Sequence, residues 1–136
     1  MKKPVPATGC PCGLGASHAV CCGRYSAPGG VAAPTAEALM RSRYSAYVLG
    51  DEVWLLASWH ASTRPERLGL AEETPPLKWL GLDIVATRDG REGDAAGTVE
   101  FVARYKQGGR ACRLREISRF VCEDGRWYYV DGDVDG

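Results

Sequence analysis

Residues 97–122 decide the fold class, and they read GTVEFVARYKQGGRACRLREISRFVC. On both sides of the central Gln107-Gly108-Gly109, polar and apolar side chains alternate, which is the two-residue period of a β-strand with one face in the core. Two successive glycines allow the tight turn that joins antiparallel strands. The stretch therefore predicts a β-hairpin with strands over 97–106 and 110–122.

The second strand of this hairpin predicts a candidate pocket. Its expected inward face carries Cys112, Leu114, Glu116, Ser118, Phe120 and Cys122. Glu116 and Ser118 thereby enter an otherwise apolar layer, where a carboxylate needs a partner to offset its desolvation. We expect that partner to be Arg43 on a helix or, failing that, His60.

Two interpretations of the group Glu116, Ser118, Arg43 and His60 remain open at the level of sequence. The simpler one is a buried ion pair that only stabilises the fold. The other is a ligand-binding or catalytic site, because desolvated carboxylates beside basic groups recur in active sites. No catalytic residue is assigned, since Cys112 and Cys122 face the core in this register.

Further elements lie on either side of the hairpin. Strands are expected over Trp79–Thr87 and Arg126–Val130, each next to a turn signal that contains Asp-Gly. Upstream, residues 35–50 repeat apolar side chains at helical spacing, and residues 51–58 do so more briefly. Helices followed by four strands predict an α+β domain, in which helices pack on one face of a curved antiparallel sheet.

Three details of the helical region can be tested. Thr35 and Asp51 are placed to cap the two helices at their N-termini, and Gly50 is placed to end the first. A short third helix is expected around residues 65–71, with Pro65 in its first turn.

The N-terminal region is organised around four cysteines. Cys10, Cys12, Cys21 and Cys22 lie within thirteen residues, whereas a disulfide framework would be spread along the chain. Two short pairs of thiolates suit a tetrahedral zinc ion. We expect structural zinc on these four ligands; a redox or disulfide role is the alternative.

Domain boundaries follow from composition. Residues 1–25 form the predicted zinc knuckle, and residues 26–34 are rich in proline, glycine and alanine, which indicates a linker. Residues 35–136 form the α+β domain. Since the linker offers few large apolar side chains, the knuckle is expected to be a semi-independent lobe.

Composition excludes several classes of function. The chain has 136 residues, with 17 basic and 17 acidic side chains, so its net charge does not indicate nucleic-acid binding. It carries no apolar run long enough for a signal peptide or a membrane span. We expect a cytoplasmic protein with no membrane association.

The cysteine stretch resembles the SEC-C motif. It reads Cys10-Pro-Cys12-Gly-Leu-Gly-Ala-Ser-His-Ala-Val-Cys21-Cys22-Gly23 and keeps the spacing of all four ligands. It departs from the usual pattern at Leu14 and His18, neither of which removes a ligand. His18 is expected to pack or face solvent, because structural zinc sites close with four ligands.

The rest of the chain resembles the YchJ family of bacterial proteins. The matching runs are Leu39-Met-Arg-Ser-Arg-Tyr-Ser-Ala-Tyr47, Trp59-His60, Trp79-Leu-Gly-Leu82, Val99-Glu-Phe-Val-Ala-Arg104 and Gly125-Arg-Trp-Tyr-Tyr-Val-Asp-Gly132. The resemblance implies a cone-shaped domain of the nuclear-transport-factor-2-like type joined to the zinc knuckle.

Two classes of function are carried forward. In the first, the protein is an interaction or adaptor module whose knuckle docks onto a protein or the ribosome, as the SEC-C resemblance implies. In the second, the cone cavity binds a small molecule or turns it over. A cavity that opens to solvent and has Glu116 at its floor would favour the second class, and a filled core would favour the first.

Overall fold

The computed structural model describes residues 10–14, 16–27, 29–70 and 77–135. The helices are η1 (His18–Val20, a 3-10 helix), α1 (Gly23–Ser26), α2 (Ala36–Leu49) and α3 (Glu52–Ala57). The strands are β1 (Leu77–Asp89), β2 (Ala96–Gln107), β3 (Arg110–Glu123) and β4 (Arg126–Asp135). The strands form one antiparallel sheet in the order β1-β2-β3-β4, which confirms the predicted α+β class.

The central hairpin has the predicted register. Gln107 of β2 pairs with Arg110 of β3, and Gly108 and Gly109 both have positive φ, at 59° and 82°. A turn with two positive φ angles matches the right-handed twist of the strands that it joins. The alternation of faces along β3 is therefore as predicted, and Ser118 and Phe120 are buried on its inner face.

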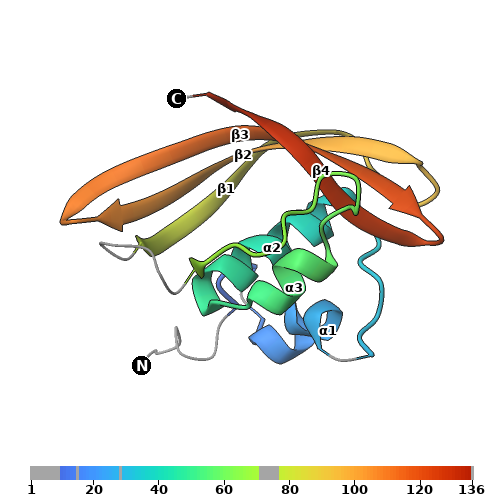
Figure 1. Ribbon diagram of the computed structural model, residues 1–136, viewed down its shortest axis with the longest axis horizontal. Helices are drawn as coiled ribbons and strands as arrows, with labels where there is room; N and C mark the ends of the chain where they lie inside the picture. Colours follow the sequence, from blue (N-terminus) through green and yellow to red (C-terminus); the bar gives the residue numbers. More distant parts are fainter. Residues whose placement is uncertain (1–9, 15, 28, 71–76, 136) are drawn as a thin grey trace.

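The sheet curves over α2, which lies along its concave side (Figure 1). Thr35 Oγ1 accepts a hydrogen bond from the Ala38 amide, and Gly50 ends the helix with a φ of 73°. Asp51 caps α3 in the same way by accepting from the Trp54 amide. The core between helix and sheet consists mainly of Leu39, Met40, Tyr44, Val99, Phe101, Phe120 and Trp127.

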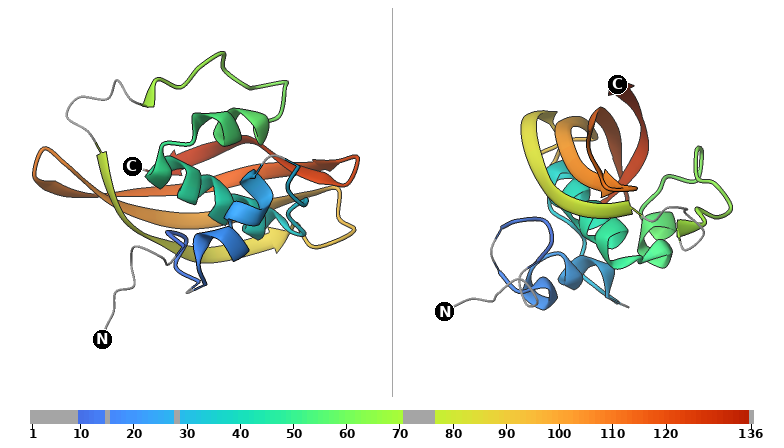
Figure 2. Two further views of the ribbon diagram at one scale, coloured as in Figure 1. Left: turned by 90° about the horizontal axis from the view of Figure 1, so that it is seen from below. Right: turned by 90° about the vertical axis from the view of Figure 1, so that its left-hand side faces the viewer.

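The described part of the N-terminal region, residues 10–14 and 16–27, packs on the other side of α2. This helix therefore lies between that region and the sheet (Figure 2). The Arg41 guanidinium donates to the Cys12 carbonyl at 3.0 Å, and Cys10 Sγ lies 3.3 Å from Ser45 Oγ. Tyr25 is buried in the main core. Tyr25 and the polar contacts to α2 thus attach the knuckle to the main domain, which argues against the semi-independent lobe that the composition of the linker predicts.

The last strand continues beyond its predicted end at Val130, where the structure has a β-bulge. Phe120 pairs with Tyr129, but its neighbour Arg119 pairs with Asp131, so the inner and outer faces exchange at this point. Beyond the bulge Asp131 and Asp133 both form ion pairs with Arg119 on the outer face. Backbone pairing with residues 115–119 of β3 keeps residues 131–135 in the sheet.

The expected third helix is absent over residues 65–69; Leu70 has 3-10 helical geometry, and residue 71 lies outside the described residues. Gly69 has a φ of 68°, which does not fit a right-handed helix. The backbone amides of Leu68 and Leu70 donate instead to the carboxylate of Glu52, at 3.1 and 3.5 Å. The Glu52 side chain on α3 thus accepts hydrogen bonds from backbone amides that a helix in this segment would pair internally.

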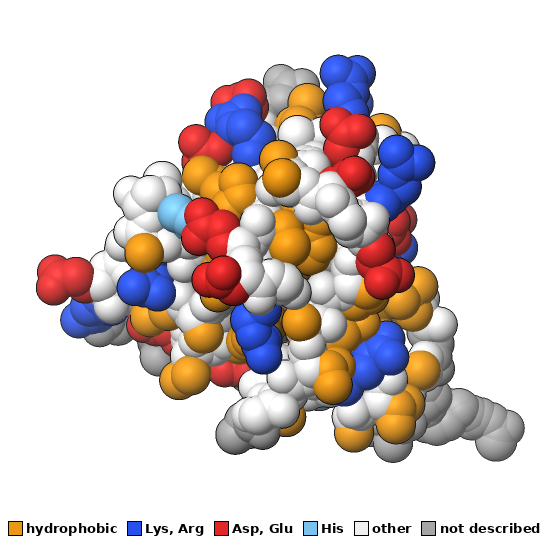
Figure 3. Space-filling model, turned by 90° about the vertical axis from the view of Figure 1, so that its right-hand side faces the viewer, with side chains coloured by type: hydrophobic (Ala, Val, Ile, Leu, Met, Phe, Trp, Pro, Cys, Tyr) orange, Lys and Arg blue, Asp and Glu red, His pale blue; other side chains and the backbone are white. Residues whose placement is uncertain are grey.

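Charges of both signs are interspersed on the face shown in Figure 3. Across the sheet, Arg104 pairs with Asp83 and Arg115 pairs with Glu100. This mixture agrees with the zero net charge of the chain. In the described part of the chain, no helix has the length and apolar character needed to cross a membrane.

Candidate metal centre and ligand cavity

The structure brings the four N-terminal cysteines together. The Sγ atoms of Cys10, Cys12, Cys21 and Cys22 all lie within 4.8 Å of one another, and all four residues are buried. The Sγ atoms of Cys12 and Cys21 are 3.6 Å apart. Four sulfurs at about 2.3 Å from a central zinc ion lie about 3.8 Å from one another, so this donor set fits a tetrahedral metal ion.

The pKa shifts of the thiols also differ within the cluster. A hydrogen bond from Cys22 lowers the pKa of Cys12 to about 5, whereas burial raises the pKa of Cys21 to about 11. The hydrogen bond with Cys12 and burial raise the pKa of Cys22 as well. One thiolate thus disfavours ionisation of its neighbours, and a cation held among the four sulfurs would favour their thiolate forms.

His18 is close to the cluster but is not one of the four converging ligands. Its Nδ1 lies 3.5 Å from Cys10 Sγ, and the residue is half-buried. A hydrogen bond to a ligand sulfur at this distance orients the cysteine and leaves four sulfurs for the metal.

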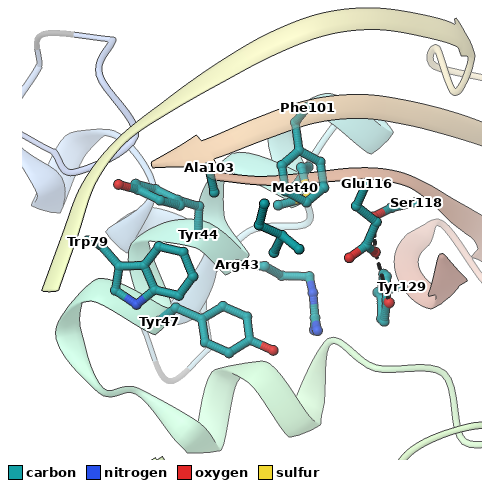
Figure 4. Close-up of a pocket in the computed structure, with 11 residues that line it drawn as sticks. Met40, Arg43, Tyr44, Tyr47, Trp79, Phe101, Ala103, Glu116, Ser118 and Tyr129 are labelled. Carbon is teal, nitrogen blue, oxygen red and sulfur yellow. Dashed lines mark hydrogen bonds between the residues drawn. The ribbon is translucent and has the colours of Figure 1, made fainter. Parts of the chain in front are cut away.

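A separate cavity of about 200 Å³ lies between α2 and the inner face of the sheet (Figure 4). Most of its wall is apolar or aromatic and consists of Met40, Tyr44, Tyr47, Trp79, Phe101, Ala103 and Leu114. Its polar lining consists of Arg43, Glu116, Ser118 and the hydroxyl of Tyr129. Tyr47, Trp79 and Leu114 are only half-buried. The cavity therefore has a polar end on β3 and β4 and an aromatic end near Trp79.

Arg43 brings a positive charge into this cavity. Its side chain is buried, with 3% exposed, and Nη1 donates to the Leu55 carbonyl at 2.8 Å and to Ser58 Oγ at 2.7 Å. The guanidinium also lies over the rings of Trp59 and Tyr129, 5.0 and 4.5 Å from their centroids. Burial lowers the pKa of Arg43 to about 10, so the group remains charged at neutral pH.

Glu116 provides the opposite charge from β3. Its Oε2 accepts hydrogen bonds from Ser118 Oγ at 2.6 Å and from the Tyr129 hydroxyl at 3.1 Å. Burial and the nearby Glu116 charge raise the pKa of Tyr129, which keeps its hydroxyl protonated as a donor. The carboxylate lies over Gly132, where a Cβ atom would come within 2.1 Å of Oε2. Glycine at 132 therefore leaves room for this position of Glu116.

The expected partners of Glu116 need two corrections. Arg43 acts on Glu116 through their opposite charges, while the hydrogen bonds of Glu116 come from the sheet. Glu116 is half-buried rather than largely buried, because it lines the cavity instead of packing against a helix. His60 lies elsewhere, with Nε2 2.9 Å from Glu123 Oε2 and Nδ1 2.7 Å from Ser62 Oγ.

The sequence analysis missed the aromatic part of the cavity. Tyr47 falls within the helical repeat of residues 35–50 and Tyr129 within the predicted last strand, so neither is predicted as a site residue. Tyr129 lies two residues after Trp127 in a strand, so both face the core, and this spacing could have identified it.

Fold and site together define a nuclear-transport-factor-2-like α+β protein that carries an N-terminal SEC-C cysteine cluster. Residues 35–132 match the family model described as YchJ, middle NTF2-like domain. The chain belongs to this YchJ family, also called UPF0225.

Relatives and solved structures agree with that membership. A UPF0225 protein of Chromobacterium violaceum is 61% identical, over 92% of each chain, and one of Bordetella pertussis is 52% identical, over 98% of each. The solution structure of a SEC-C motif containing protein from Rhodopseudomonas palustris has a TM-score of 0.80 at 33% identity, covering 94% of this chain and 99% of that one. A crystal structure from Psychrobacter arcticus, also of a SEC-C motif containing protein, has a TM-score of 0.74 at 26% identity, covering 94% and 83%.

Proposed function

We propose that this protein binds a small organic molecule in the cavity between α2 and the sheet, and that a zinc ion on Cys10, Cys12, Cys21 and Cys22 stabilises the fold. The observation that carries the proposal is a charged pair, Arg43 and Glu116, in the wall of an unfilled aromatic cavity. Pockets that combine an apolar wall with a few convergent polar groups are the usual form of a small-molecule site.

Energetics support binding over a purely structural role for this cavity. Burial of the Arg43 charge is costly, because the guanidinium is desolvated and has no hydrogen-bonded carboxylate partner among the described residues. Larger side chains at Ala103 or Ser118 would fill the cavity, and features that are kept at a cost to stability are typical of functional sites.

The zinc ion has a structural role in this proposal. Four thiolates close the coordination of zinc and leave no position for a substrate or an activated water. The knuckle holds α2 from the side opposite the sheet, through Arg41 and Ser45. An adaptor role, with a protein or the ribosome docking onto the knuckle, stays a prediction, and the unfilled cavity favours the small-molecule class.

Filling the cavity tests the proposal. Ala103→Leu places three more carbon atoms between Leu114 and Leu82, its neighbours on the strands to either side. We expect the variant to remain folded and to lose binding of small aromatic compounds, which a fluorescence thermal-shift screen on both proteins would measure. Val85→Leu, an exposed position outside the cavity, is the control and should bind as the unaltered protein does. Equal binding by Ala103→Leu and the unaltered protein would place the ligand elsewhere.

A further inference from the structure

The chemistry of the cavity wall restricts which ligands it can take. We infer that the ligand is an uncharged single-ring aromatic compound whose polar head both accepts and donates hydrogen bonds, as a carboxamide does; this rests on the proposed binding function.

Size sets the first limit. A cavity of about 150 Å³ in another protein accommodates benzene, so 200 Å³ holds one six-membered ring with a head group of a few atoms. The aromatic end supplies faces and edges for that ring. Tyr44 and Trp79 lie edge to face, with centroids 5.8 Å apart, and Phe101 and Met40 complete the wall.

The polar end determines the head group. Both hydrogen bonds donated by Arg43 come from Nη1 and point to α3, at the Leu55 carbonyl and Ser58 Oγ. A guanidinium carries five N–H donors, so Nε and Nη2 hold three more that can serve a ligand acceptor. Both hydrogen bonds to Glu116 end on Oε2, and Figure 4 shows the other carboxylate oxygen on the side of Arg43. A ligand head at this point meets a donor and an acceptor together.

The charges of the cavity wall disfavour a ligand with an ionised head group. Arg43 and Glu116 together have no net charge, so a carboxylate ligand would gain from Arg43 and be repelled by Glu116. An amidinium ligand would be attracted by Glu116 and repelled by Arg43. An ionised head therefore gains from one of these two groups and is repelled by the other, whereas a neutral carboxamide accepts from Arg43 through its oxygen and donates to Glu116 through its nitrogen.

Three ring compounds of nearly equal shape test the inference: benzamide is neutral, benzoate is an anion and benzamidine is a cation at neutral pH. Toluene, which has no polar head, reports on the cavity alone. Isothermal titration of the intact protein with each should give benzamide an affinity at least about tenfold above the other three, the size of effect expected for a charge-assisted hydrogen bond.

The Glu116→Gln variant tests the role of the carboxylate. Removing the negative charge should raise affinity for benzoate about tenfold and lower affinity for benzamidine. Glu123→Gln is the matched control, because Glu123 is an exposed carboxylate bonded to His60 outside the cavity, and it should leave the ranking unchanged. The ranking on the unaltered protein decides the matter even if Glu116→Gln does not fold.

The possible outcomes separate the inferred ligand class from the proposed binding function of the cavity. Tightest binding by benzamide supports both. Binding of toluene with no preference for benzamide would overturn the ligand class and leave the cavity function standing, and so would tightest binding by benzoate or benzamidine. Binding of none of the four compounds would overturn both.

Discussion

Cys12→Ser is expected to abolish zinc binding and to destabilise the whole protein. Apparent free energies of zinc binding to small structural sites are about 10–16 kcal/mol, and that energy is folding energy for the segment that holds the ligands. The Cys12 carbonyl also accepts a hydrogen bond from Arg41, which connects the knuckle to α2. Loss of the metal should therefore spread to α2 rather than stay within residues 10–23.

Metal analysis and thermal unfolding check this expectation. The unaltered protein should carry one zinc ion per chain, and both Cys12→Ser and chelator-treated protein should melt well below it. Cys112→Ser is the matched control, because Cys112 is a half-buried cysteine outside the cluster and should retain the metal. If chelation left the main thermal unfolding transition unchanged, the knuckle would be independent of the α+β domain. Disulfides in place of the metal would refute the zinc site.

Arg43→Ala is expected to cost about 3–5 kcal/mol of the free energy of unfolding, the range for removing one member of a buried charged network. The substitution removes the donor to the Leu55 carbonyl and Ser58 Oγ and the contacts with the Trp59 and Tyr129 rings. Glu116→Gln should cost less, about 1–2 kcal/mol, because Ser118 and Tyr129 can still donate to the amide oxygen.

Urea denaturation of both variants measures the difference. Arg91→Ala provides the control, since that arginine is highly exposed and should be nearly neutral. If Arg43→Ala cost no more than Glu116→Gln, the guanidinium would not be the centre of the network. Arg43→Met adds a separate reading: a stable variant that binds no ligand would show that the charge serves binding rather than folding.

The sequence predicted the elements whose signals are local. The glycine pair at 108 and 109 determined the central hairpin, and its register placed Glu116 and Ser118 on the inner face. Thr35, Gly50 and Asp51 marked the helix ends because capping depends on neighbouring residues. Cysteine spacing likewise predicted the cluster, since its four sulfurs lie on one short segment.

Features that depend on distant pairing could not be predicted in this way. The bulge near Val130 changes which residues face the core, and a two-residue period read through it gives the wrong face for Gly132. The hydrogen bond from Tyr129 to Glu116 depends on that pairing. Packing of Tyr25 in the core depends on where the knuckle lies against α2, which its own residues do not encode.

The binding claim can be tested most directly through the indole N–H signal of Trp79. The chain has four tryptophans, of which Trp79 lines the cavity, whereas Trp54 donates its indole N–H to Ser42 away from it. Nuclear magnetic resonance spectra of nitrogen-15-labelled protein, with the four signals assigned by single Trp→Phe variants, should follow a benzamide titration. We predict that the Trp79 signal shifts saturably while the Trp54 signal stays in place. A Trp79 signal that does not move with any small aromatic compound, in protein that holds its zinc, would contradict ligand binding in this cavity.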